Sequence, residues 1–174
     1  MTIDDRRDTG LTASHGGSWR LVTDQVMGGV SDGRLLGDRH QGRDCLRLLG
    51  SVSTANNGGF VQMVLDLAGG EAFDATAYTG IALLVAGNGE RYNLHLRTSD
   101  VWLPWQSYRA SFVATPEWRE LRIPFTEFEA YRTSRRLRPD RLVRLGLVAI
   151  GRDFEADLCL GGARFYRDEN GTGP

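Results

Sequence analysis

WRLVTDQVMGGVSDG, residues 19–33, begins with a short apolar segment, Trp19–Val22, that we expect to form a β-strand. Polar residues follow around the pair Gly28 and Gly29, with Asp24 just before them. Two adjacent glycines in an otherwise apolar run supply either a positive φ angle or room for another backbone segment to approach closely. The stretch therefore predicts a tight polar corner directly after a strand.

A second stretch, STANNGGF at residues 53–60, has the same organisation. Two side-chain amides come before Gly58 and Gly59, and an apolar residue follows them. Two such corners predict one feature built from two pieces of chain. We expect the side chains of Asp24 and Asn57 to accept hydrogen bonds from main-chain N–H groups of their own or the opposite corner. The corners either close a sandwich or line a binding cleft, and the sequence leaves both interpretations open.

The composition is that of a soluble globular domain. The chain has 174 residues, 41% of them hydrophobic, and a formal net charge of −1. All 21 basic residues are arginines. The absence of lysine excludes a Schiff-base lysine, a phosphate-loop lysine and a lysine general base.

Short apolar segments separated by glycine-rich turns predict nine or ten strands and an all-β sandwich or barrel. Residues 81–85 are apolar on both faces, which is typical of a central strand. Gly87-Asn88-Gly89 predicts a hairpin to the next strand, residues 91–97. In that strand the apolar residues alternate with Asn93, His95 and Arg97, so these three side chains share one face.

Five segments together resemble the complex I intermediate-associated protein 30 family. They occur in the family's order: residues 19–33, SVSTANNGGFVQM at 51–63, RYNLHLRTSD at 91–100, WQSYRASF at 105–112, and WRELRIPFTEF at 118–128. The resemblance implies a jelly-roll β-sandwich of the galactose-binding-like type, related to carbohydrate-binding modules. It also implies a non-catalytic role in the assembly of respiratory complex I. Arg132 matches an arginine of the family, but Thr133 stands where many members have glycine.

The candidate binding residues belong to the two corners and to the polar strand face. Trp102 and Trp105 follow that strand, and aromatic rings beside amides and arginine are how β-sandwich modules hold sugars or peptide segments. An ordinary solvent-facing strand explains the same pattern. The full set is Asp24, Gln25, Asn56, Asn57, Asn93, His95, Arg97, Trp102, Trp105, Gln106 and Arg132, with Gly28, Gly29, Gly58 and Gly59 as structural corners.

Catalytic and cofactor motifs are missing from the sequence. No two of the three histidines have metal-ligand spacing, and no nucleophile elbow, dinucleotide fingerprint or phosphate loop is present. We therefore expect that the protein is not an enzyme and that it binds neither a catalytic metal nor a cofactor. The sequence does not decide whether a structural calcium is bound. The arginine-rich stretch 132–144 lacks interleaved aromatic residues in a chain that is neutral overall, which favours a solvated loop over a nucleic-acid surface.

The remaining expectations concern the termini, the cysteines and the compartment. Residues 1–16 are polar and predict a flexible arm ahead of a single domain at 17–168. Cys45 and Cys159 lie in apolar strand contexts and predict buried free thiols rather than a disulfide. No apolar run approaches the length of a membrane span, and the acidic N-terminal residues argue against a targeting peptide, so we expect a cytoplasmic protein.

Together these observations predict a non-catalytic binding protein that takes part in assembly and has a protein partner. A respiratory-complex subunit or assembly intermediate is the partner that the family resemblance implies. Two alternatives remain: a carbohydrate-binding module, and an accessory domain that binds a small metabolite or RNA.

Overall fold

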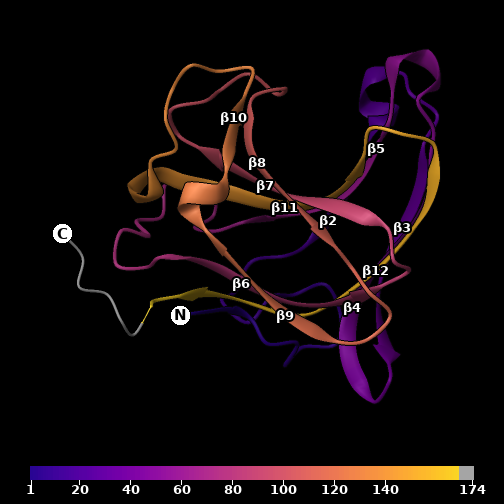
Figure 1. The fold of residues 1–174 in the computed structure, drawn as a ribbon, viewed down its shortest axis with the longest axis horizontal. Helices are drawn as coiled ribbons and strands as arrows, with labels where there is room; N and C mark the ends of the chain where they lie inside the picture. The colour runs from indigo at the N-terminus through magenta and orange to yellow at the C-terminus, as the bar shows by residue number, and fades with distance from the viewer. Residues whose placement is uncertain (169–174) are drawn as a thin grey trace.

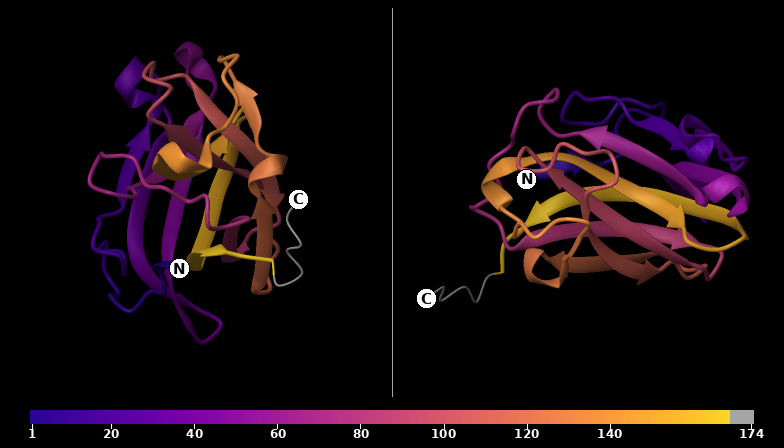
Figure 2. Two further views of the ribbon diagram at one scale, coloured as in Figure 1. Left: turned by 90° about the vertical axis from the view of Figure 1, so that its left-hand side faces the viewer. Right: turned by 90° about the horizontal axis from the view of Figure 1, so that it is seen from above.

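Two antiparallel β-sheets pack face to face in the structure, a computed structural model that describes residues 1–168 (Figures 1 and 2). The first sheet has the order β3-β4-β12-β6-β9, with β1 also paired to β12. Its strands are β1 (Thr2–Asp4), β3 (Asp32–His40), β4 (Arg43–Val52), β6 (Gly80–Gly87), β9 (Arg119–Pro124) and β12 (Phe154–Tyr166).

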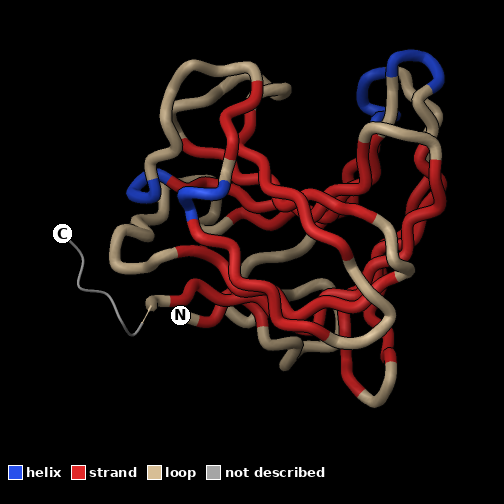
Figure 3. The backbone as a smooth tube through the Cα atoms, viewed as in Figure 1, coloured by secondary structure: helices blue, strands red, loops and turns tan. Residues whose placement is uncertain are grey.

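The second sheet has the order β10-β8-β7-β11-β5-β2. Its strands are β2 (Arg20–Thr23), β5 (Phe60–Asp66), β7 (Arg91–Thr98), β8 (Ser107–Val113), β10 (Glu129–Tyr131) and β11 (Leu142–Ile150). The helical segments of residues 1–168 are short 3₁₀ turns, blue in Figure 3: η1 (Asp24–Met27), η2 (Ala55–Asn57), η3 (Phe125–Glu127) and η4 (Pro139–Arg141). The all-β sandwich expected from the sequence is confirmed, with two more three-residue strands than we counted.

Side-chain alternation explains why the sheets pack as they do. In β7, Tyr92, Leu94 and Leu96 are buried in the core between the sheets, while the residues between them face away from it. A strand with period-two alternation can bury one face and leave the other to water. The expected central strand is β6, which lies between β12 and β9. The core therefore fixes which side chains of the second sheet point outward.

The connection after β6 differs from the expectation. β6 belongs to the first sheet and β7 to the second, so Gly87-Asn88-Gly89 links the two sheets and is not a hairpin turn. The N–H of Gly89, at a φ of 82°, donates to the carbonyl of Ala114. A local turn signal gives the reversal of the chain, but it does not say which strand the next segment will join.

The N-terminal segment is attached to the sandwich, which corrects the expected flexible arm. Ile3 is only 1% exposed and belongs to the core, and β1 pairs with β12. The buried carboxylate of Asp4 accepts hydrogen bonds from the guanidinium and main-chain N–H of Arg6 and from the indole N–H of Trp19, the last at 2.8 Å. One apolar residue and one buried acid therefore anchor a segment whose composition is otherwise polar.

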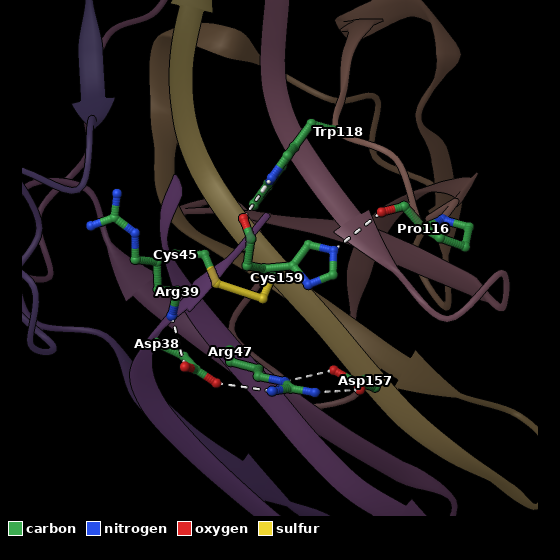
Figure 4. The surroundings of a disulfide bond; sticks show 9 residues. Asp38, Arg39, Cys45, Arg47, Pro116, Trp118, Asp157 and Cys159 are labelled. Carbon is green, nitrogen blue, oxygen red and sulfur yellow. Dashed lines mark hydrogen bonds and ion pairs between the residues drawn. A yellow bond between two sulfur atoms is a disulfide. The ribbon is translucent and has the colours of Figure 1, made fainter. Parts of the chain in front are cut away.

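The two cysteines form a disulfide, so the expectation of free thiols was wrong. Cys45 in β4 and Cys159 in the neighbouring β12 have Cα atoms 5.4 Å apart, and both residues are buried. Their side chains point away from the core, on the side of the first sheet where Trp118 lies (Figure 4). The indole N–H of Trp118 donates to the main-chain carbonyl of His40 at the end of β3. On the same face, Arg47 makes two hydrogen bonds to Asp157, at 2.7 and 2.8 Å. The pairing depends on strand order, which the local sequence does not specify.

Reduction of the disulfide should lower the free energy of unfolding by about 4 kcal/mol, because the cross-link spans 114 residues and restricts the unfolded chain. Urea unfolding with and without a thiol reductant measures the effect. The Cys45→Ala, Cys159→Ala double variant is the control and should not respond to the reductant. Full alkylation of both cysteines in denaturant without reductant would contradict the disulfide.

Candidate functional site

Asp24 joins the two glycine corners. It is fully buried in η1, and its carboxylate accepts hydrogen bonds from the N–H and hydroxyl of Ser31 at 2.9 and 2.5 Å. The same carboxylate accepts from the N–H of Gly59 at 2.5 Å and from that of Phe60 at 3.2 Å. Ser31 continues the link, because its hydroxyl accepts from the N–H of Ser53 at 2.9 Å. One carboxylate thus connects chain segments that lie about 35 residues apart.

The four corner glycines divide into two kinds. Gly28 and Gly59 have φ angles of 85° and 132°, which side chains rarely adopt. A Cβ atom at Gly29 would lie 2.4 Å from Cγ of Asp24, and one at Gly58 would lie 2.5 Å from its Oδ2. Each corner therefore contains one glycine that turns the chain and one that makes room for the carboxylate.

Burial raises the pKa of Asp24, but the hydrogen bonds from Ser31, Gly59 and Phe60 outweigh it and hold the pKa below its usual range. The carboxylate is therefore ionised, and its charge is distributed over four donors. Asn57, in contrast, makes no side-chain hydrogen bond to either corner within the described residues, so that expectation was wrong. Asn56 and Asn57 contribute positive φ angles of 56° and 59° instead.

The first corner presents apolar side chains to solvent. Val26, Met27 and Val30 are 75%, 61% and 52% exposed. The amide of Gln25 donates to the carbonyl of Ser31 at 2.8 Å, which holds this loop closed. The corner thus has an exposed apolar tip, and its polar candidates Asp24 and Gln25 form hydrogen bonds within the protein.

A polar face covers the outer side of the second sheet, which lies across the middle of Figure 1. We use this name for the outward residues of three adjacent strands: Asn93, His95 and Arg97 of β7, Arg109 and Ser111 of β8, and Arg144 of β11. Register brings them together, since Asn93 pairs with Ser111, His95 with Arg109, and Arg97 with Arg144. The expected row on β7 therefore extends over its neighbours.

His95 is uncharged in this face. Burial and the neighbouring Arg109 lower the pKa of His95 to about 3. The Ser111 hydroxyl donates to Oδ1 of Asn93 at 2.8 Å, and the Asn93 amide nitrogen lies 3.5 Å from Nε2 of His95. At physiological pH, Ser111, Asn93 and His95 therefore form an uncharged hydrogen-bonding group at the centre of the polar face.

Two half-buried arginines of the polar face have no acidic partner. Burial is the main cause that lowers the pKa of both Arg97 and Arg109; Arg144 adds to the effect at Arg97. Arg144 itself donates to Asp66 at 2.7 Å, but neither Arg97 nor Arg109 forms an ion pair within residues 1–168. Partly desolvated charges without a counter-charge are costly in a folded protein unless a ligand or water compensates them.

The two tryptophans lie at one end of this face. They belong to the connection between β7 and β8, with Trp102 82% exposed and Trp105 57% exposed. The guanidinium of Arg97 donates to the carbonyl of Pro104 at 3.0 Å in the same loop. Gln106 donates to the main-chain carbonyl of Arg132 at 3.2 Å, so those two candidates also meet here. Arg132 has a φ of 59°. The residue after it is Thr133, where many family members have glycine.

The structure separates the candidate residues into two groups. Phe60, next to the Asp24 corner, pairs with Ile150 at one end of β11, whereas Thr98, next to the tryptophan loop, pairs with Leu142 at the other end. The corner group and the polar face therefore do not form one site. Sequence reasoning missed Tyr131, whose ring lies 3.6 Å from the guanidinium of Arg109, because β10 is too short to show alternation.

Within the described residues, no group of three or more His, Cys, Asp or Glu side chains could hold a metal ion. The helical segments in residues 1–168 are also too short to cross a membrane.

Comparison with known proteins defines the family. A sequence model described as complex I intermediate-associated protein 30 matches residues 11–160. The chain belongs to this family. No curated protein matches the chain by sequence.

Solved structures share the fold of this family member. The family 11 carbohydrate-binding module of cellulosomal cellulase Lic26A-Cel5E from Clostridium thermocellum superposes with a TM-score of 0.74 at 12% identity, covering 97% of this chain and 94% of that one. The family 30 module of cellulase Cel9D-Cel44B from the same organism has a TM-score of 0.67 at 14% identity, with coverages of 98% and 99%. These neighbours have the jelly-roll sandwich fold that the family resemblance implied, and at such identities they show the fold alone.

Asp24→Ala should lower the free energy of unfolding by about 3 kcal/mol, because buried N–H donors of Ser31 and Gly59 lose their acceptor. Chemical denaturation measures the change. The control is Asp32→Ala, which removes an exposed carboxylate of β3 and should change stability little. Equal stability of both variants would show that the corner is held by something other than Asp24.

His95→Gln should make the protein less sensitive to mild acid. The pKa of His95 is about 3 in the folded state and about 6.5 in the unfolded state, so the unfolded chain takes up the proton first. Stability should therefore fall by up to about 1.4 kcal/mol per pH unit below about pH 6.5 in the wild type, and less in the variant. Urea unfolding from about pH 7 to about pH 4.5 gives both slopes. Equal slopes would mean that His95 keeps an ordinary pKa.

Proposed function

We propose that this protein is a non-catalytic binding module that acts in assembly by holding a protein partner on its polar face. Membership of the complex I intermediate-associated family supports an assembly role. Its structural neighbours are named as carbohydrate-binding modules, which are also binding domains. The proposed partner is a respiratory-complex subunit or assembly intermediate.

The observation that carries this proposal is the state of Arg97 and Arg109. Both guanidinium groups are partly buried on an outward face, yet neither forms an ion pair with a carboxylate within the described residues. Trp102 and Trp105 are exposed beside them. Large exposed aromatic rings next to arginine are typical of the residues that dominate binding energies at protein interfaces.

The disulfide bears on where the protein works. We expected a cytoplasmic protein, but disulfides persist mainly in oxidising compartments. The bond between Cys45 and Cys159 favours such a compartment over the cytoplasm.

A carbohydrate ligand is the second candidate function. A family 11 module with the same fold, at a TM-score of 0.72, is described in complex with a mixed-linked tetrasaccharide. The exposed rings of Trp102 and Trp105 are the feature of this chain that favours a sugar, because aromatic faces stack on pyranose rings.

Blocking the polar face should remove partner binding without unfolding the protein. Ser111→Trp adds a large side chain at an exposed position of β8 that faces this surface, and tryptophan is well tolerated in strands. Quantitative cross-linking and mass spectrometry in a native lysate should show at least about a tenfold loss of specific partners, equal to about 1.4 kcal/mol. Ser51→Trp, at an exposed position of β4 in the other sheet, is the matched control.

Retention of every partner by Ser111→Trp would exclude the polar face as the binding surface. A glycan array distinguishes the second candidate, since binding of a defined glucan that Ser111→Trp abolishes would support a carbohydrate module instead.

A further inference from the structure

We propose that the ligand of the polar face is an extended acidic peptide segment whose carboxylates, at alternate positions, pair with Arg97 and Arg109. This inference rests on the proposed function and specifies the chemistry of its partner. The occupant is one strand-like segment of another protein, with two acidic side chains on the same side of its backbone.

Contacts within the protein fix the side chain of Arg109 in a position that suits such a ligand. Its Nε donates to the Ser107 hydroxyl at 2.9 Å, and its guanidinium stacks on the ring of Tyr131 at 3.6 Å. Its terminal nitrogens make no hydrogen bond within residues 1–168. Arg97 is fixed in a similar way, because one terminal nitrogen donates to Pro104 and the rest of the guanidinium has no protein acceptor in the described chain. Fixed guanidinium groups with unused donors match the two oxygens of a carboxylate.

The spacing of the two arginines selects an extended peptide. Arg109 pairs in register with His95, and Arg97 is two residues further along β7, so the arginines are diagonal neighbours on one face. Diagonal neighbours across two strands are about 7–8 Å apart. Side chains at positions i and i+2 of an extended peptide are separated by nearly the same distance, about 6.6–7 Å.

Neighbouring acids restrict the ligand further. Glu129 is the register partner of Arg109 on β10, and Asp66 accepts from Arg144 on the opposite side of the face. A continuous polyanion such as RNA would lie against the carboxylates of both Glu129 and Asp66 and be repelled by them. A peptide with only two acidic side chains can place them between these carboxylates. A neutral glucan would leave both guanidinium groups without a counter-charge.

The two tryptophans indicate what should flank the acidic pair. Trp102 and Trp105 are exposed in the loop that holds Arg97, at the end of β7. A peptide that runs past Arg97 meets these rings, so an apolar residue is expected next to the acids. An acidic pair followed by an apolar residue would combine charge pairing with burial of aromatic surface.

Fluorescence anisotropy with labelled synthetic peptides tests the inference. The probe is a peptide of about nine residues with Glu at two alternate positions followed by Leu, which spans about 30 Å when extended. Its control has Gln in place of both Glu residues. The wild type should bind the Glu peptide at least about tenfold more tightly than the Gln peptide, and salt should weaken that binding.

Matched variants assign the binding to the two arginines. Arg97→Gln and Arg109→Gln should each weaken binding of the Glu peptide about tenfold or more, equal to about 1.4 kcal/mol. Arg34→Gln, which removes an exposed arginine of β3 in the other sheet, should leave binding unchanged. Arg97→Lys and Arg109→Lys keep the charge and should retain part of the affinity, which separates loss of charge from loss of fold.

Equal affinity for the Glu and Gln peptides would overturn the proposal, as would an equal effect of Arg34→Gln. Tighter binding of a mixed-linked tetrasaccharide or of polyuridylate, lost in Arg97→Gln, would assign the face to a sugar or to RNA instead. Failure of the Glu peptide while Ser111→Trp still abolishes partner capture would reject only the acidic ligand. Failure of both would also reject the polar face as the binding surface.

Discussion

One buried carboxylate, that of Asp24, connects the parts of this sandwich that have no strand pairing between them. Its four hydrogen bonds reach Ser31 at the start of β3 and Gly59 and Phe60 at the start of β5. β3 belongs to the first sheet and β5 to the second, so the interaction ties the two sheets at one edge. Because an unpaired buried charge is so unfavourable, each partner must be in position before the corner is stable.

The same constraint accounts for the glycines. A side chain at Gly29 or Gly58 would overlap Asp24, and a side chain at Gly28 or Gly59 would strain the backbone. The double-glycine pattern around an acid was therefore readable from the sequence, because only a few physical reasons produce it. The alternation in β7 was readable for a similar reason, since its apolar residues can be satisfied only on one face.

What the sequence did not reveal depends on contacts between distant segments. The Cys45–Cys159 bond requires β4 and β12 to be neighbours, and no local pattern specifies strand order. The anchoring of Ile3 depends on β12, which lies at the far end of the chain. The sequence also did not say how far apart the glycine corners and the polar face lie, because the spacing of motifs along the chain does not tell which end of a sheet each one occupies.

The disulfide turns most of the molecule into a closed covalent ring. Residues between Cys45 and Cys159 cannot be drawn apart by a force applied at the two ends, so about 400 Å of contour length stays hidden while the bond is intact. The ring contains the polar face and the second glycine corner, whereas Asp24 lies outside it. Under tension the segments before Cys45 and after Cys159 are the parts that can be pulled away, and the hydrogen bond from Gly59 to Asp24 is one of the non-covalent contacts that resist removal of the first.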